Sequence, residues 1–323
     1  MPLVPCLRGC LALVLVVAHG AAIAQSFPSL TRTIELARQE AYRGGDVDWP
    51  AVQSKAEGIA GKDGEDAAIR YVLKALGDGH SSYRPPPSRE APIGGTPMAA
   101  DPHAAGTGIV ESIDPIEGVP ILRINAWSGP PEAASAAVAS LRDRLAASLE
   151  TQSCGLVLDF SRNSGGNMWP MLVGLAPLLT EGPLGYFRDR SGAEQAIEKR
   201  NGAIYLAGKP HFLNRDSGAE PLRFARHVGI VIGSRTSSSG EITAIMFLGQ
   251  RNTRFFGAES SGYSTANRVH RLPNGGSIAL TAGITLDRNR HDHGVRLKPD
   301  FVTEAGNRDA AHWVRSQCGQ ETS

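Results

Sequence analysis

The sequence has almost no excess of charge of either sign. Its 323 residues include 33 lysines and arginines and 32 aspartates and glutamates. Because a nucleic-acid binder needs a lopsided basic surface to neutralise phosphates, this balance argues against a nucleic-acid partner. Aromatic residues make up only 6% of the chain, so no stacking platform for single strands stands out either. The hydrophobic content of 41% nevertheless excludes a disordered chain and suffices for one large core or two modest domains.

Long apolar runs are scarce. The run from Leu11 to Val17 follows Arg8 and precedes the small residues Ala22 and Ala24, which is the pattern of an export signal with its cleavage site. The run is too short to span a bilayer comfortably. We therefore predict a signal peptide over residues 1–24, a periplasmic or extracellular location, and no membrane span in the mature chain.

Cysteines are few as well. Two of the four lie in the predicted signal peptide, which leaves Cys154 and Cys318. In an oxidising compartment these two either form a disulfide that ties the C-terminal segment to the core or remain separate buried thiols. Both interpretations stay open, because a disulfide depends on whether the two sulfurs meet in space.

Glycine and proline are abundant, with 37 and 21 residues, and favour an α/β or all-β protein over a helical bundle. Apolar residues at helical spacing predict a small N-terminal unit of three helices over residues 26–84. Residues 85–105 are rich in proline, glycine and small side chains and are predicted to be a linker. An α/β core is expected over residues 106–305 and a C-terminal tail over residues 306–323.

Strands and helices are predicted to alternate within the core, which favours parallel pairing through right-handed crossovers. The turn Pro273–Gly276 is a hairpin signal between two further strands, Arg268–Leu272 and Ser277–Thr285. The other predicted strands are Ile109–Val110, Ile121–Ile124, Gly155–Phe160, Val228–Ile232 and Arg254–Gly257, and the predicted helices are Pro131–Leu149 and Met168–Leu179.

A cluster of serines follows one of these strands. The segment Thr236–Glu241 leads from the strand Val228–Ile232 into an apolar helix, Ile242–Leu248. A serine on such a turn is exposed and faces the positive end of the helix dipole, where free backbone N–H groups can bind an oxyanion. The alternative is that these residues merely cap the helix. No Gly-x-Ser-x-Gly elbow surrounds the serines, which disfavours an α/β-hydrolase.

Two other segments carry candidate functional groups. Gly165 and Gly166 follow the buried strand Gly155–Phe160 and offer a second source of N–H donors, unless they form an ordinary tight turn. His80 lies just past the third predicted helix. It is either a helix cap or surface residue, or a base that the fold brings to the serine turn.

Taken together and in order, these segments resemble the tail-specific (C-terminal processing) serine protease family, most closely its tricorn-core and interphotoreceptor-retinoid-binding-protein-like branches. The resemblance covers about residues 30–303 and implies a crotonase/Clp-protease-like core of ββα units. The matching segments are Asp78–Ser81, Asp159–Gly166 and Thr236–Glu241, with Gly257–Gly262, the hairpin and Gly294–Asp300 as closing elements.

The resemblance also implies roles for individual residues. Ser238, three residues before the family's glutamate, would be the nucleophile and His80 its general base. The amide of Ser239 and that of Gly165 or Gly166 would hold the oxyanion. The implied function is a secreted or periplasmic serine endopeptidase that acts on a protein or peptide substrate without a cofactor; no feature indicates an oligomeric state.

The sequence departs from the family at two places that bear on catalysis, and Phe160–Ser161 in place of the usual Leu-Arg is a smaller deviation. Many members carry a lysine about 25 positions after the serine, where this chain has Tyr263, so a Ser-Lys dyad is disfavoured. Asp292 is the nearest carboxylate to the usual acid position, which His291 occupies, and is the candidate third catalytic residue; Asp287 is a weaker candidate.

Three alternatives to this interpretation are a metal site, a non-catalytic binding protein and an esterase. His291 and His293 with Asp292 suggest a metal site, but no further ligand cluster has metal-site spacing, so no metal is predicted. A non-catalytic protein that binds an apolar ligand on the same fold, or an esterase with the same residues, would also fit.

About 28 residues separate His80 from Ile109, too few for the family's PDZ insertion.

Overall fold

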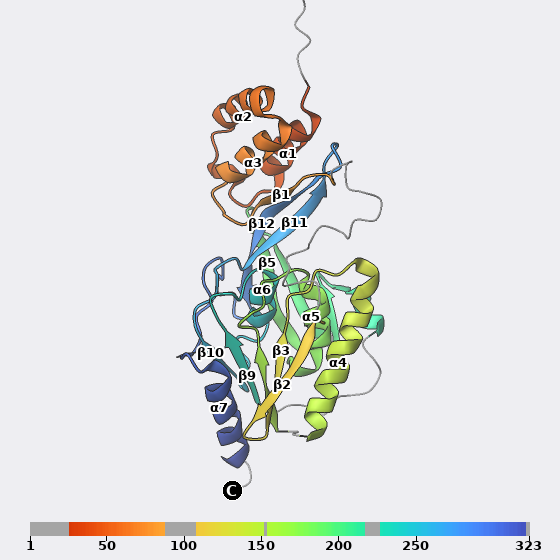
Figure 1. Ribbon diagram of the computed structural model, residues 1–323, viewed down its shortest axis with the longest axis vertical. Coiled ribbons are helices and arrows are strands. Elements are labelled where there is room, and N and C mark those ends of the chain that lie inside the picture. Colours follow the sequence, from red (N-terminus) through yellow and green to blue (C-terminus); the bar gives the residue numbers. More distant parts are fainter. Residues whose placement is uncertain (1–25, 88–107, 152–153, 217–226, 321–323) are drawn as a thin grey trace, which may run out of the picture.

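The computed structural model describes residues 26–87, 108–151, 154–216 and 227–320 of the chain (Figure 1). The predicted signal peptide and most of the predicted linker lie outside the described residues. None of the helices in these four ranges is both long and apolar enough to cross a membrane.

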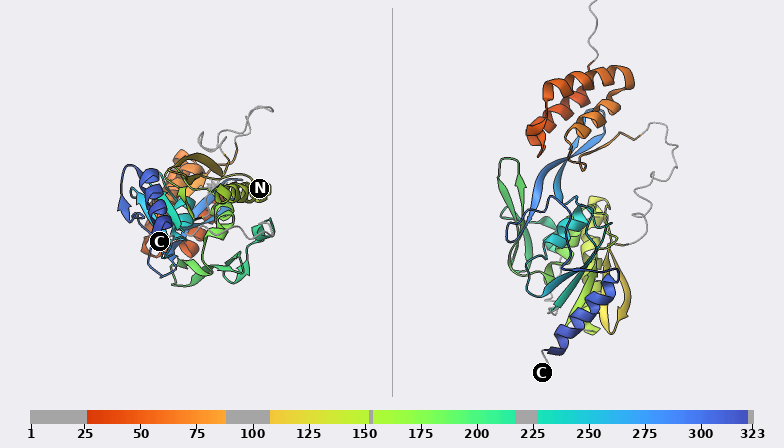
Figure 2. Two further views of the ribbon diagram at one scale, coloured as in Figure 1. Left: turned by 90° about the horizontal axis from the view of Figure 1, so that it is seen from below. Right: turned by 90° about the vertical axis from the view of Figure 1, so that its left-hand side faces the viewer.

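Three helices lie at one end of the elongated molecule (Figures 1 and 2). They are α1 (Pro28–Glu40), α2 (Trp49–Asp63) and α3 (Glu65–Ala75). The Asp48 carboxylate caps α2 by accepting a hydrogen bond from the backbone amide of Ala51 at 3.2 Å. A single turn of 3-10 helix, Gly44–Asp46, lies between α1 and α2.

The helices share one hydrophobic core with a long hairpin. As the turn sequence predicts, the hairpin consists of two antiparallel strands, β11 (Thr265–Arg271) and β12 (Ser277–Asp287). The short strand β1 (Ser82–Arg84) follows the helices and pairs antiparallel with β12. The segment that contains His80 is therefore held against the hairpin. The shared buried side chains include Leu30, Leu36, Ile69, Val72, Leu272, Ile278 and Leu280.

A six-stranded, mostly parallel sheet forms the centre of the protein. Neighbouring strands pair in the order β13-β10-β9-β4-β3-β2, and only β2 and β3 are antiparallel. The predicted parallel pairing is therefore confirmed for β3, β4, β9 and β10, whereas β2, which begins at the predicted strand Ile109–Val110, is antiparallel to β3. The strands are β2 (Val110–Ile116), β3 (Val119–Ile124), β4 (Gly155–Asp159), β9 (His227–Ile232), β10 (Thr253–Gly257) and β13 (Phe301–Val302).

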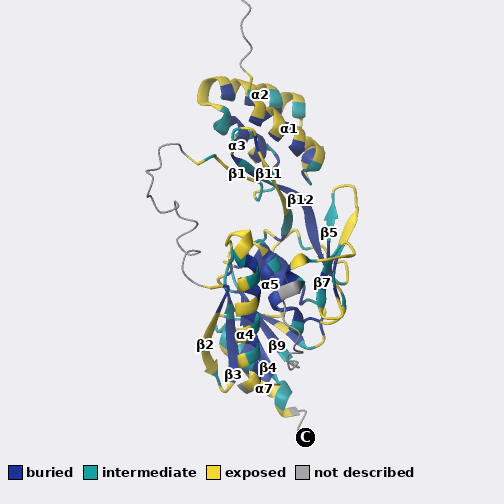
Figure 3. Ribbon diagram, turned by 90° about the vertical axis from the view of Figure 1, so that its right-hand side faces the viewer, coloured by how far each residue is buried: buried dark blue, intermediate teal, exposed yellow. Residues whose placement is uncertain are grey.

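Helices cover both faces of this sheet, so its central strands are buried on both sides (Figure 3). One face packs against α4 (Ala134–Thr151), α5 (Met168–Gly174) and α6 (Ser239–Ile245). The other packs against α7 (Gly306–Gln320). One turn of 3-10 helix precedes α4 (Pro131–Ala133), and another follows α5 (Ala176–Leu178).

A second, antiparallel sheet joins the hairpin to the core. Its strands pair in the order β1-β12-β5-β6-β7-β8, and β11 pairs with the other edge of β12. No element was predicted for the segment that forms β5–β8. These strands are β5 (Gly182–Asp189), β6 (Glu194–Arg200), β7 (Ala203–Leu206) and β8 (Lys209–Pro210), and the 3-10 helix Phe212–Asp216 follows them.

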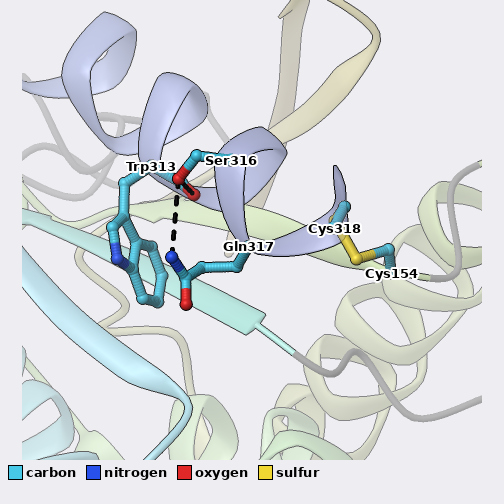
Figure 4. The surroundings of a disulfide bond; sticks show 5 residues. All are labelled: Cys154, Trp313, Ser316, Gln317 and Cys318. Atoms are coloured by element: carbon cyan, nitrogen blue, oxygen red, sulfur yellow. Dashed lines mark hydrogen bonds between the residues drawn. A yellow bond between two sulfur atoms is a disulfide. The ribbon is translucent and has the colours of Figure 1, made fainter. Parts of the chain in front are cut away.

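Cys154 and Cys318 form a disulfide (Figure 4). Their Cα atoms are 5.9 Å apart, and the bond joins the residue before β4 to the last turn of α7. The segment expected to be a C-terminal tail is thus mostly a helix, whose residues Ala310 and Val314 are fully buried against the sheet. Of the two alternatives for the cysteines, the structure has the disulfide.

Candidate active site

Ser238 lies between the end of β9 and the start of α6, where it caps the helix. Its backbone has φ = +51°, which is costly for a residue with a side chain and persists only where neighbours enforce it. One of these neighbours is Thr236, whose hydroxyl accepts a hydrogen bond from the Gly233 amide and donates one to the Phe160 carbonyl, both at 2.9 Å. The amide of Ser237 bonds to the Asn163 carbonyl at 2.9 Å, so the loops after β4 and β9 are fastened together.

The buried carboxylate of Glu241 supports the same turn. Its Oε2 atom accepts hydrogen bonds from the amides of Ser238, at 2.9 Å, and Tyr263, at 2.8 Å. Its Oε1 atom accepts bonds from the Gly262 amide, at 2.8 Å, and from the Ser260 hydroxyl. One side chain therefore positions both the backbone of Ser238 and the segment that leads into β11.

His80 meets Ser238 although the two are 158 positions apart in the chain. The Nε2 atom of His80 lies 3.0 Å from the Oγ atom of Ser238, within hydrogen-bond distance. The Nδ1 atom lies 2.6 Å from the hydroxyl oxygen of Thr265. The carboxylate of Asp78 accepts bonds from the backbone amides of His80, at 2.9 Å, and Ser81, at 2.7 Å, and so shapes the turn after α3.

Burial lowers the pKa of His80 below its ordinary value of 6.5, and the negative charge of Asp78 opposes this effect only in part. The imidazole is consequently neutral at neutral pH. A neutral imidazole with Nε2 beside a serine hydroxyl has the geometry and the protonation state that proton abstraction requires.

The two candidate oxyanion glycines differ in what their amides do. The Gly165 amide donates to the Asn163 side-chain oxygen at 2.9 Å, so it is already engaged. Among the described residues, the amides of Gly166 and Ser239 have no hydrogen-bond acceptor. Of the two glycines left open by the sequence, Gly166 is therefore the one with a free donor.

Both glycines are required by the geometry. Gly165 and Gly166 have φ = +108° and +102°. A Cβ atom on Gly165 would lie 2.9 Å from the Cβ of Ser238 and 3.2 Å from the amide nitrogen of Ser239. A Cβ atom on Gly166 would lie 2.1 Å from the Trp127 carbonyl oxygen. The turn after β4 can thus approach Ser238 only without side chains.

The structure does not bring Asp292 to His80, which corrects the expected triad. The Asp292 carboxylate pairs with Arg188 at 2.6 Å and is more than half exposed. Arg188 belongs to β5, which pairs with β12, so Asp292 is held at that strand and not at the imidazole. The position of Asp292 in the sequence, near the closing motif, therefore did not predict its partner in space. The neutral hydroxyl of Thr265 lies beside the Nδ1 atom of His80 instead.

Asp287, the weaker candidate, is engaged elsewhere too. Its Oδ2 atom contacts His291 at 3.0 Å and His293 at 3.3 Å. Burial alone would raise the pKa of Asp287, but hydrogen bonds from His291, His293 and Asn289 outweigh it and lower the pKa. No group of three or more side chains arranged to hold a metal ion is found in the described part of the chain.

A cavity of about 590 Å³ opens beside Ser238 and Ser239. Its walls come from the start of α5, from β5 and β6, and from the hairpin. Apolar side chains and a few polar groups line it, as is usual for a ligand site. The lining residues include Met168, Trp169, Phe187, Leu206, Ile242 and Ala282, together with Asp189, Gln195, Asn267 and Arg268.

Comparison with known protein families matches the chain to one of them. The model of peptidase family S41 matches residues 118–303, more than half of the chain. The chain belongs to peptidase family S41. The ordered motifs of the sequence pointed to this family, and no PDZ domain is present in the described residues. Membership of the family favours the enzymatic interpretation over that of a non-catalytic binding protein.

One curated relative is the nisin-resistance protein of Lactococcus lactis subsp. lactis, which is 32% identical over 164 residues. The match covers half of this chain and half of the relative, so the chain spans about half the length of the curated relative it matches.

Solved structures share the fold. A lipoprotein from Streptococcus agalactiae has a TM-score of 0.74 at 23% identity, with 91% of this chain and 97% of that one covered. A putative peptidase from Parabacteroides merdae has a TM-score of 0.53 at 17% identity, covering 92% and 96%. The photosystem II D1 C-terminal processing protease has a TM-score of 0.52 at 15% identity, covering 87% and 94%. These likenesses confirm the predicted α/β core, which is consistent with the crotonase/Clp-protease type.

The contact of Thr265 with His80 was not predicted from the sequence. Glu241 served only to align the chain with the family's glutamate and so to locate Ser238. No local pattern distinguishes Thr265 from the other small polar residues at strand ends. A buried glutamate three residues after a serine does carry a signal, since it matches the helix-capping pattern. That pattern predicts the bond to Ser238 but not the bonds to the distant Gly262 and Tyr263.

Proposed function

We propose that the protein is an exported endopeptidase in which Ser238 is the nucleophile and His80 the general base. The observation that carries this proposal is the 3.0 Å contact between the Nε2 atom of His80 and the Oγ atom of Ser238. The two residues come from separate parts of the fold, and the strained backbone of Ser238 presents its hydroxyl at the end of a helix and beside a cavity.

The proposed reaction follows from the positions of the groups. The Oγ atom of Ser238 attacks the carbonyl carbon of a peptide bond while its proton moves to Nε2 of His80. The amides of Gly166 and Ser239 bind the oxygen that becomes negative. The C–N bond then breaks as His80 returns the proton to the leaving amine. Water, deprotonated by His80, hydrolyses the acyl-enzyme and restores Ser238.

An exported location has three supports. The N-terminal segment has the pattern of a signal peptide. The disulfide between Cys154 and Cys318 is typical of an oxidising compartment. The structural neighbour from Streptococcus agalactiae is described as a lipoprotein, and we propose a cell-envelope or extracellular location for this chain as well.

The test is active-site labelling with a fluorophosphonate probe, followed by hydrolysis of a peptide panel. Nisin belongs in that panel because of the name of the Lactococcus relative. We expect wild-type protein to be labelled, Ser238→Ala to be unlabelled, and His80→Ala to be labelled at least about 100-fold more slowly, since general-base catalysis contributes about 10²–10⁴-fold.

Ser237→Ala is the matched control, because it removes a hydroxyl from the same turn. It should keep both the label and the far-ultraviolet circular dichroism spectrum. Folded wild-type protein that resists the probe, or equal labelling of Ser238→Ala, would refute the proposed site.

A further inference from the structure

We propose that Thr265 is a positioning residue for His80: its hydroxyl oxygen accepts the Nδ1–H hydrogen bond and so directs the lone pair of Nε2 at Ser238. This inference rests on the proposed function, because it assigns a role through His80. Thr265 occupies the side of the imidazole where a carboxylate was expected and where none of the described acidic residues contacts the ring.

A neutral imidazole exists as two tautomers. Only one ring nitrogen then carries a hydrogen, and the other accepts. For Nε2 to take a proton from Ser238, the hydrogen must be on Nδ1. At 2.6 Å from Nδ1, the hydroxyl oxygen of Thr265 is close enough to accept this hydrogen, which stabilises the productive tautomer and fixes the plane of the ring.

The position of Thr265 is itself well determined. It is the first residue of β11 and pairs with Ile284 of β12. The preceding hydroxyl, that of Ser264, donates to the Val295 carbonyl at 3.2 Å. One residue earlier, the Tyr263 amide bonds to Glu241, the carboxylate that also holds the Ser238 amide. The positioning residue and the proposed nucleophile thus share a support.

The charged and titratable groups around His80 can be named. Asp78 lies on its own turn and bonds to its backbone amide, and its negative charge acts on the ring. From the facing segment, the ring of Tyr263 lies 5.4 Å from the imidazole. The carboxylate of Glu241 is turned toward backbone amides. A neutral hydroxyl at Nδ1 therefore orients the imidazole without adding a second negative charge beside it.

The experiment compares three purified full-length variants. Thr265→Val removes the hydroxyl at constant shape, and Thr265→Ser keeps it. Thr285→Val is the matched control, because the buried Thr285 hydroxyl on the neighbouring strand has no hydrogen-bond partner among the described residues. The measurements are kcat, KM, the pH dependence of kcat/KM, and the imidazole ¹⁵N shifts of His80.

We expect Thr265→Val to lower kcat by about 10- to 100-fold with little change in KM, because a hydrogen bond to the imidazolium formed in the transition state is lost. The acidic limb of its pH profile should move to lower pH, since the charged ring loses an acceptor. Thr265→Ser should stay within about threefold of wild type, the size expected when the bond is kept. Thr285→Val should behave as wild type.

The ¹⁵N shifts provide a readout that does not depend on turnover. In wild-type protein they should report a hydrogen on Nδ1, and in Thr265→Val a mixture of tautomers. A wild-type hydrogen on Nε2, a Thr265→Ser variant as impaired as Thr265→Val, or a Thr265→Val variant with unchanged kcat and spectrum would each overturn the inference. Failure of the proposed function has a different signature: Ser238→Ala would remain active.

Discussion

Replacing Glu241 by glutamine tests how one buried carboxylate supports the proposed active site. Glutamine keeps the shape of the side chain but turns one oxygen into an NH₂ group that cannot accept a hydrogen bond. If the NH₂ replaces Oε2, the amides of Ser238 and Tyr263 both lose their acceptor. If it replaces Oε1, only the Gly262 amide is stranded, because the Ser260 hydroxyl can rotate and accept instead.

The second orientation is cheaper and should prevail. It leaves one buried N–H group unpaired, which costs about 1–3 kcal/mol, and the remaining bonds lose the strength that a charged acceptor confers. Burying a neutral amide rather than a carboxylate offsets part of this loss. We therefore expect Glu241→Gln to lower the free energy of unfolding by about 2–4 kcal/mol, a large share of the usual total of about 5–15 kcal/mol.

Urea unfolding followed by tryptophan fluorescence measures this difference. Ser237→Ala, which removes a hydroxyl from the same turn and leaves the carboxylate and its four donors in place, is the control and should keep the wild-type stability. In the favoured orientation the Ser238 amide keeps its acceptor, so the folded Glu241→Gln protein should still react with a fluorophosphonate. The loss expected from the hydrogen bonds is about 2–4 kcal/mol. If the free energy of unfolding of Glu241→Gln lies within about 1 kcal/mol of the wild-type value, this expectation is refuted.

Three further predictions follow from the same structure. Burial lowers the pKa of His80 below 6.5, so the imidazole stays neutral to lower pH. A pH profile of kcat/KM should therefore keep its plateau below pH 6.5 and fall only at more acidic pH. A midpoint well above pH 6.5 would contradict this prediction. Gly165→Ala should lower the rate of fluorophosphonate labelling by at least about 100-fold, the effect of losing an oxyanion donor. The reason is that the new methyl group would lie against Ser238 and the Ser239 amide. Labelling at the wild-type rate would show that the turn can move aside. Replacing Cys154 and Cys318 by serine should lower the free energy of unfolding by about 5 kcal/mol on the chain-entropy model, because the disulfide closes a loop of 164 positions. Urea unfolding measures this loss. A loss of under about 1 kcal/mol would indicate a structured unfolded state.

The local sequence patterns determined much of the architecture. Helical spacing located α1–α3, the alternation of apolar strands with helices predicted the parallel order of the central sheet, and the Pro-Asn-Gly-Gly turn predicted the β11–β12 hairpin. These features depend on backbone geometry and apolar periodicity over a few residues, which the sequence records directly. The strands β6–β8 were not predicted because they carry many polar and half-exposed side chains, and β7 and β8 have only 4 and 2 residues, so no clear apolar period marks them.

Sequence also supplied the chemical groups of the candidate site, since a serine at a helix start, a histidine past a helix and two glycines after a buried strand can each be recognised locally. The partners of those groups were decided by tertiary structure alone. That Gly165 is engaged and Gly166 free depends on the side chain of Asn163, and that His80 faces Thr265 rather than Asp292 depends on how the hairpin and Arg188 lie. Such pairings follow from contacts between segments far apart in the chain, and no local period encodes which of several oxygens a distant ring will meet.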